Sequence, residues 1–159
     1  MDHLFTPWRY AYVTRPREEG CVLCRLAGSE PSEDQGTFVV HRAQRNFIVL
    51  NIYPYNTGHL MIVPRLHVDR LAALPPDSLQ EMFSLAVRAE AVLEEVYRPE
   101  GINLGMNLGR CAGAGIEDHI HLHLVPRWAA DTNFITVAGR TRVLPEDLAE
   151  TWRKLRGRF

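Results

Sequence analysis

The sequence predicts an α+β fold with an antiparallel sheet of about five strands, one long helix and a short C-terminal helix. Two observations predict it. Short runs rich in β-branched and aromatic residues alternate with turn residues, and the apolar period changes to that of a helix from Pro75 onward. The 159 residues correspond to one domain, with residues 1–20 as an N-terminal arm and residues 129–159 as a C-terminal extension.

The predicted strands are short segments bounded by turn residues. They are residues 37–40, 46–51, 59–63, 102–108 and 118–125. The polar run over residues 28–36 is predicted as a surface loop, and residues 109–115 as a flexible link before the last strand. Consecutive strands of this kind favour an antiparallel arrangement.

The long helix is predicted by apolar residues at helical spacing and ends before Pro99 and Gly101. Its start fits either a capping box from Ser78 to Glu81 or Pro76 as the first helical residue. The apolar face consists of Leu79, Met82, Phe83, Ala86, Leu93, Val96 and Tyr97. A short helix from about Pro145 carries Leu148, Trp152 and Leu155 at the same spacing.

Composition excludes several classes of protein. With 46% hydrophobic and 23% charged residues, the chain is neither collagen-like, disordered nor a disulfide scaffold. A net charge of −1 gives no electrostatic reason to bind nucleic acid or a membrane. The apolar runs are too short to cross a bilayer, the first 25 residues lack a signal peptide's apolar region, and three Cys fit a reducing compartment. We therefore expect a cytoplasmic protein.

The strongest chemical feature is the run His119-Ile120-His121-Leu122-His123. In a strand, alternation sends the three imidazoles to one face and the apolar residues to the other. Neighbouring imidazoles then lie about 7 Å apart along the strand. Because charged imidazoles repel one another, at least one ring stays neutral near neutral pH, available as a nucleophile or as a metal ligand.

Two neighbouring segments help to separate these uses. A cupin-like metal site needs a Glu shortly after the His-x-His pair, and residues 124–128 contain none, which weakens the metal-oxygenase hypothesis. Gly113 and Gly115, just before the histidines, let backbone N–H groups approach an anion closely. Together these residues indicate a phosphate group beside a nucleophile.

Residues 112–128, with the three histidines at their centre, resemble the signature of the histidine-triad (HIT) family in its bacterial and archaeal form. A second stretch, Asn51 followed by residues 53–54 and 57–64, is similar to another conserved part of that family. The similarity covers residues 21–128. Residues 5–13 and 125–134 resemble the branch that contains diadenosine tetraphosphate phosphorylases.

This resemblance implies a HIT-like fold and a nucleotidyl hydrolase or transferase, in which His121 attacks the α-phosphorus of a dinucleoside polyphosphate. A nucleotidyl-His121 intermediate is then released as a mononucleotide by water, or as a nucleoside diphosphate by phosphate. The resemblance implies phosphate contacts for His123 and His59, and a ribose contact for Asn51. The remaining phosphate contacts that it implies are Asn107 and the backbone of Gly113, Ala114, Gly115 and Ile116.

The resemblance also implies a structural metal site and an assembly. In zinc-binding members, the matching positions here are Cys21, Cys24, His67 and His119, a Cys2His2 set suited to tetrahedral zinc. Such a site is closed, so the zinc is structural and catalysis needs no metal. Cys111 has no matching role and is expected to be a free thiol. Related proteins join two sheets in a homodimer, and we expect the same here.

Two alternatives to this function remain open. The first is a hydrolase of adenosine phosphoramidates or adenylyl sulfate, which uses the same chemistry with another leaving group. The second is a nucleotide-binding regulatory protein with little catalysis, although the intact triad argues against it.

Overall fold

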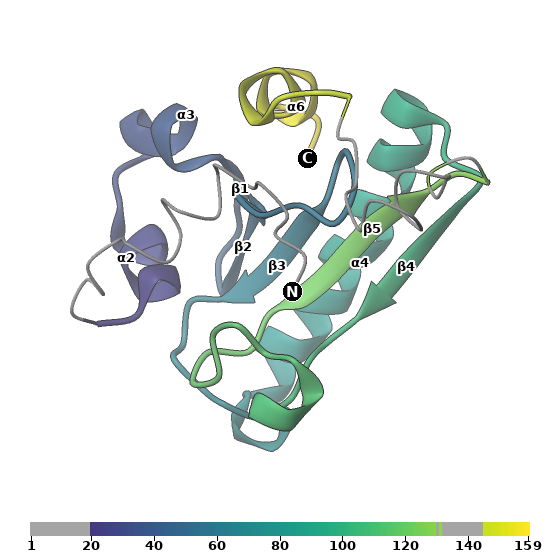
Figure 1. Ribbon diagram of the computed structural model, residues 1–159. Helices are drawn as coiled ribbons and strands as arrows, with labels where there is room; N and C mark the ends of the chain where they lie inside the picture. The colour runs from purple at the N-terminus through teal and green to yellow at the C-terminus, as the bar shows by residue number, and fades with distance from the viewer. Residues whose placement is uncertain (1–19, 130, 132–144) are drawn as a thin grey trace, which may run out of the picture.

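The computed structural model describes residues 20–129, 131 and 145–159. Five strands form one sheet in the order β1-β2-β3-β5-β4, and every neighbouring pair is antiparallel (Figure 1). The strands are β1 (Val39–Arg42), β2 (Asn46–Leu50), β3 (Leu60–Pro64), β4 (Gly101–Gly105) and β5 (Leu122–Arg127). The predicted α+β fold is confirmed.

One face of the sheet is covered by α4 (Pro76–Tyr97), which lies behind β5 in Figure 1. Pro76 is the first helical residue, so of the two predicted starts the proline is the correct one. Of the residues on the predicted apolar face, Phe83 is 49% exposed and lies outside the core. Residues on the α4 side of the sheet and helix form the main core, which includes Ile48, Leu60, Ile62, Met82, Ala89, Leu93 and Leu124.

The opposite face is partly covered by a helix that the sequence did not predict, α2 (Val22–Gly28). Its Leu23 is buried in a second apolar cluster with Phe47, Val49, Met61 and Val63. The predicted loop over residues 28–36 is also wrong, because η1 (Pro31–Glu33) begins two residues after α2 and continues into α3 (Asp34–Thr37). A capping box between Glu30 and Glu33 stabilises the start of η1.

Strand boundaries differ from the prediction where the chain enters or leaves the sheet. Strand β1 begins only at Val39, because residues 34–37 are helical and Phe38 has a left-handed backbone with φ of 57°. Strand β5 begins at Leu122 rather than at residue 118, since the segment before it bonds elsewhere: the Ile120 N–H donates to Val68 O at 2.8 Å. Strand β4 ends at Gly105, and η3 (Arg110–Ala112) occupies part of the predicted flexible link.

The C-terminal helix α6 (Leu148–Leu155) lies across β1 and α4 (Figure 1). The Asp147 carboxylate caps its start by accepting a hydrogen bond from the Glu150 N–H at 2.7 Å. The Trp152 indole then donates to the Val39 carbonyl at 2.7 Å, which fixes the helix on the sheet edge. Most of the predicted N-terminal arm and residues 132–144 of the predicted extension lie outside the described residues. In the described part of the chain, no helix is long and apolar enough to cross a bilayer.

Candidate active site and metal centre

The three histidines of the triad lie on the sheet face opposite α4, as the alternation predicts. Ile120, Leu122 and Leu124 belong to the main core under α4. His123 is part of β5, whereas His119 and His121 lie in the segment that leads into this strand. All three imidazoles are buried, so each ring nitrogen needs a partner in the protein, a ligand or a metal.

Hydrogen bonds fix the proton positions on His59 and His123. The Tyr55 backbone N–H donates to His59 Nδ1 at 3.0 Å, so this nitrogen carries the lone pair. In the neutral ring the proton is therefore on Nε2, which donates to His123 Nδ1 at 2.9 Å. His123 then carries its own proton on Nε2, a buried group that has no partner among the described residues. This N–H is a ready donor to a ligand oxygen.

A carbonyl group determines the tautomer of His121. His121 Nδ1 lies 2.9 Å from the His119 carbonyl oxygen, which can only accept, so Nδ1 carries the proton. The neutral ring consequently has its lone pair on Nε2. The His121 and His123 rings are neighbours in an edge-to-face arrangement, with centroids 4.8 Å apart.

Burial keeps the His59–His123 pair neutral. Desolvation, followed by the charges of His123 and His121, lowers the pKa of His59 to about 3. Desolvation and the charge of His121 lower the pKa of His123 to about 4. Near neutral pH the pair therefore acts through its N–H groups rather than through positive charge.

The other residues predicted to bind a nucleotide lie around the triad. The Asn51 N–H donates to the His59 carbonyl at 3.0 Å, so Asn51 is beside His59 at the end of β2. The Asn107 amide donates to Gly113 O at 3.5 Å, which ties the end of β4 to the glycine-rich link. Gly113 has φ of 91°, a conformation that favours glycine. Asn107 also lines a groove together with His123, and the phosphate contacts expected of Ala114, Gly115 and Ile116 stay a prediction.

A groove of about 400 Å³ opens beside His123 over β4 and β5, a volume within the usual range for ligand sites. At the edge of this groove, the Tyr55 ring lies against the imidazoles of His59 and His123. Its centroid is 4.7 Å from that of His59 and 5.8 Å from that of His123. The residues lining the groove are Tyr55, Asn103, Leu104, Gly105, Met106, Asn107, His123, Val125 and Arg127.

Sequence reasoning missed how the loop before His59 is held. Asn56 is buried, and its amide donates to Pro126 O at 3.0 Å and to the Asp131 carboxylate at 2.9 Å. Its own side-chain oxygen accepts from the Thr57 N–H. Asp131 also binds the Arg127 guanidinium through two hydrogen bonds. An asparagine between turn residues predicts only a turn, so no sequence signal identified this network.

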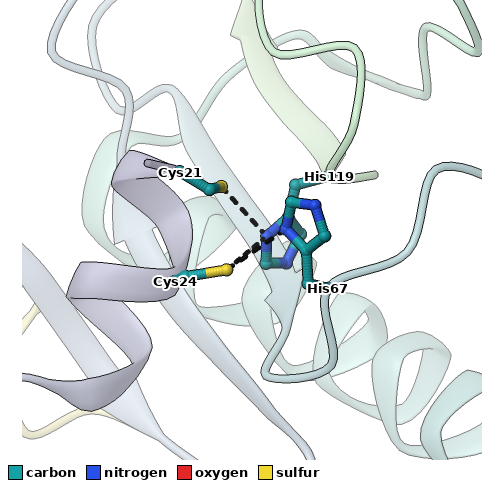
Figure 2. A group of neighbouring side chains, drawn as sticks. All are labelled: Cys21, Cys24, His67 and His119. Atoms are coloured by element: carbon teal, nitrogen blue, oxygen red, sulfur yellow. Dashed lines mark hydrogen bonds between the residues drawn. The ribbon is translucent and has the colours of Figure 1, made fainter. Parts of the chain in front are cut away.

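The four predicted metal ligands come together in one cluster (Figure 2). Cys21 Sγ is 3.3 Å from His119 Nδ1, and Cys24 Sγ is 3.2 Å from His67 Nδ1. All four ligand atoms lie within 4.8 Å of one another. His119 Nε2 is 2.8 Å from the Pro64 carbonyl, which leaves Nδ1 with the lone pair that faces the two sulfurs.

The chemistry of this cluster fits a cation. Burial, with further contributions from the hydrogen bond and charge of Cys21, raises the pKa of Cys24. Two neighbouring thiolates are unfavourable without a positive ion between them, and two thiolates with two imidazoles are a common tetrahedral zinc set. The cluster can therefore hold a metal ion. Cys111 is exposed and is not part of it.

Comparison with known proteins places the chain in a family. The HIT domain model matches residues 32–130. The chain is 37% identical over 162 residues to an AP-4-A phosphorylase of Mycobacterium tuberculosis, which covers 98% of this chain and 83% of the relative. It is also 29% identical to an adenosine 5'-monophosphoramidase of Candida albicans, over 82% of this chain and 92% of that protein.

Solved structures agree with the sequence matches. A zinc-bound histidine triad family protein from Mycobacterium smegmatis superimposes with a TM-score of 0.69 and 28% identity, covering 87% of this chain and 92% of that one. The chain therefore belongs to the HIT domain family. The prediction of a HIT-family enzyme is confirmed.

Proposed function

We propose that this protein is a nucleotidyl hydrolase or transferase that cleaves dinucleoside polyphosphates such as diadenosine tetraphosphate through a covalent histidine intermediate. One observation carries the proposal: the His119 carbonyl leaves the His121 Nε2 lone pair available, beside the buried His123 Nε2–H, which no other described residue engages. A nucleophile next to a hydrogen-bond donor suits attack on a phosphate ester. The similarity to an AP-4-A phosphorylase supports the substrate class.

In the proposed reaction, His121 Nε2 attacks the α-phosphorus and forms a P–N bond while the bond to the bridging oxygen breaks. The leaving nucleotide departs with that bonding electron pair, and the His123 N–H donates to a phosphoryl oxygen in the transition state. Water or inorganic phosphate then attacks the nucleotidyl-His121 intermediate. Water releases a mononucleotide, and phosphate releases a nucleoside diphosphate.

The supporting roles are proposals of the same kind. His59 orients His123 and keeps its Nε2 protonated through their 2.9 Å hydrogen bond. Asn51 contacts the ribose, since it lies beside His59. Asn107 and the backbone of Gly113, Ala114, Gly115 and Ile116 support the phosphates. Catalysis itself needs no metal.

We further propose that Cys21, Cys24, His67 and His119 bind a structural zinc ion. The four ligand atoms are close enough for tetrahedral coordination, and no position is left open for a substrate. His119 is two residues from His121, so the ion would brace the segment that carries the nucleophile. The zinc-bound relative supports this assignment.

A homodimer and a cytoplasmic location are also part of the proposal. Among the described strands, β4 pairs with β5 alone, so its other edge is available to a second copy. Light scattering should give twice the mass of one chain, and a monomer would contradict this part. No nucleic acid or membrane partner is proposed.

The reaction is tested by incubating the pure protein with diadenosine tetraphosphate, with and without inorganic phosphate, and separating the products. ADP that appears only with phosphate would establish a phosphorylase, whereas AMP regardless of phosphate would establish a hydrolase. If neither forms, the proposal for this substrate is wrong.

A second candidate is hydrolysis of an adenosine phosphoramidate, which the similarity to a monophosphoramidase favours. Turnover of the phosphoramidate or of adenylyl sulfate, without turnover of the tetraphosphate, would select this alternative. Tight nucleotide binding without any turnover would instead indicate a regulatory protein.

A further inference from the structure

The groove over β4 and β5 carries hydrogen-bond donors at both of its ends. At one end is the buried His123 Nε2–H, which has no partner among the described residues. At the other end is Arg127, four residues further along β5 and so about 13 Å away in an extended strand. The groove is therefore long enough for more than one phosphate group.

Asn103 adds a donor whose orientation is fixed. The Arg127 Nη1–H donates to Asn103 Oδ1 at 2.7 Å, so the oxygen of this amide is already engaged. The exposed Asn103 side chain consequently presents its Nδ2 group, which only donates, to the groove that it lines. Neighbouring Gly105 has no side chain and leaves the groove open above it. A Cβ placed at this position would meet no atom within 4 Å.

The guanidinium of Arg127 is held rigidly in place. Asp131 accepts its Nε–H at 2.6 Å and an Nη2–H at 3.0 Å, and the Asp131 side chain is only 5% exposed. A guanidinium has five N–H groups, so two remain for a ligand after these bonds and the bond to Asn103. None of the described residues that line the groove is an Asp or a Glu. Because Asp131 offsets the charge of Arg127, the attraction comes from directed donors rather than from net charge.

The groove lies on the side of the triad away from the proposed ribose contact. In the sheet order β2-β3-β5-β4, Asn51 follows β2 and bonds to His59, whereas Asn103 on β4 pairs with Val125 on β5. His59 and His123 therefore stand between Asn51 and Asn103. A nucleotide with its ribose at Asn51 and its α-phosphate at the triad would extend its remaining phosphates toward β4.

We propose that this groove is a subsite for the distal phosphates of the substrate, in which Asn103 Nδ2 and the Arg127 guanidinium bind phosphates on the leaving-group side. The inference rests on the proposed function and goes beyond it, because it assigns a preference for a polyphosphate leaving group over a small one. A leaving group without phosphates would gain nothing from the groove.

The test compares two substrates in three proteins. Asn103→Asp keeps an oxygen acceptor for Arg127 but replaces the donor by a negative charge. Asn103 lies on β4, the strand whose free edge is proposed to meet a second copy, so light scattering must first show that the variant has the same mass as the wild type. Gln80→Glu makes the same amide-to-carboxylate change on the exposed side of α4 and serves as the matched control. The substrates are diadenosine tetraphosphate and adenosine 5'-phosphoramidate, which lacks distal phosphates.

Asn103→Asp should lower kcat/KM for the tetraphosphate by at least about tenfold, mainly by raising KM. It should leave kcat/KM for the phosphoramidate within about twofold of the wild-type value. Gln80→Glu should change neither. Equal losses on both substrates, or no loss on the tetraphosphate, would overturn the subsite while leaving the proposed reaction intact.

A binding measurement covers the case in which no substrate is turned over. Inorganic tripolyphosphate, titrated by calorimetry, should bind Asn103→Asp at least about tenfold more weakly than it binds the wild type or Gln80→Glu. If that difference appears without turnover, the proposed reaction is wrong and the subsite stands. Equal binding by all three proteins would refute the subsite.

Discussion

Single backbone groups determine what each histidine of the site can do. The Tyr55 N–H makes His59 a donor to His123, and the His119 carbonyl leaves His121 with a lone pair on Nε2. The Pro64 carbonyl likewise turns His119 Nδ1 toward the two cysteines. The three triad imidazoles thus differ because His119 and His121 each meet a different backbone carbonyl, whereas His123 meets the His59 ring.

His121→Ala should abolish turnover of the substrate, because it removes the only lone pair on which the proposed covalent intermediate can form. Nucleotide binding and folding should remain largely intact, since the other site residues keep their contacts. Steady-state kinetics and calorimetric titration with a nonhydrolysable nucleotide measure the two effects separately.

His41→Ala is the matched control for that experiment. His41 packs against Phe159 with a ring-centroid distance of 5.8 Å and lies on β1, away from the triad. Its replacement should leave kcat within about twofold of the wild type. Residual turnover in His121→Ala above about a hundredth of the wild-type rate would contradict the role of His121 as nucleophile.

At the scale of elements, α2 is fixed to the sheet by arginines as well as by the proposed metal site. Arg42 Nη1 donates to Leu26 O at 3.1 Å, and Arg65 Nη1 donates to Ala27 O at 2.9 Å. Both carbonyls lie in the last turn of α2, where carbonyl groups have no N–H partner within the helix. The helix that carries Cys24 is therefore positioned before any ion binds.

Cys21→Ser should lower bound zinc and the melting temperature, because the metal's binding free energy contributes to folding. The arginine contacts of α2 should keep the protein folded at room temperature. Metal analysis by mass spectrometry and thermal unfolding measure both effects. Cys111→Ser is the matched control, since Cys111 is exposed and outside the cluster. Equal metal content in the two variants would rule out the zinc site.

The loop before His59 yields a prediction about Asn56. Asn56→Ala leaves the Pro126 carbonyl and the Asp131 carboxylate without their amide donor. Losing these buried hydrogen bonds should lower the free energy of unfolding by about 1–3 kcal/mol. We also expect a lower kcat, because the loop supplies the Tyr55 N–H that orients His59. Urea denaturation and kinetics provide the measurements, and unchanged values of both would show that the network is dispensable.

The elements that the sequence predicted well are those with a clear period. The long apolar stripe identified α4, with two possible starts, and alternation placed the triad on one sheet face. Helix α2 is short and has only one fully buried residue, Leu23, so it left no periodic signal. The start of β5 depends on whether residues 118–121 find partners in the sheet, a tertiary fact that local pattern does not contain.

At the scale of the whole molecule, the two faces of the sheet have different roles: one packs the main core and the other carries the candidate sites. The main core fills the space between the sheet and α4, whereas the cysteine–histidine cluster, the triad and the groove share the other face. Beside the second apolar cluster, that face carries buried histidines, and burial keeps His59 and His123 neutral near neutral pH. This arrangement links the stability of the molecule to pH.

The free energy of unfolding should fall as the pH drops below about 6.5. In the folded protein the pKa of His59 is about 3 and that of His123 about 4, whereas an unfolded chain has ordinary histidines with pKa near 6.5. Between these values the unfolded chain binds protons that the folded one does not. The contribution of these two histidines to the free energy of unfolding is thus fully present above about pH 6.5. It decreases toward pH 4 by up to about 1.4 kcal/mol per pH unit for each histidine.

Guanidinium denaturation at several pH values measures this slope, and His59→Gln separates the pair from other titrating groups. The variant is less stable at neutral pH because the hydrogen bond to His123 changes, but it has one titrating ring fewer. Its stability should therefore depend less steeply on pH between 6.5 and 4, by up to about 1.4 kcal/mol per pH unit. Parallel curves for the two proteins would mean that His59 takes up its proton as readily in the folded chain as in the unfolded one, which would contradict its lowered pKa.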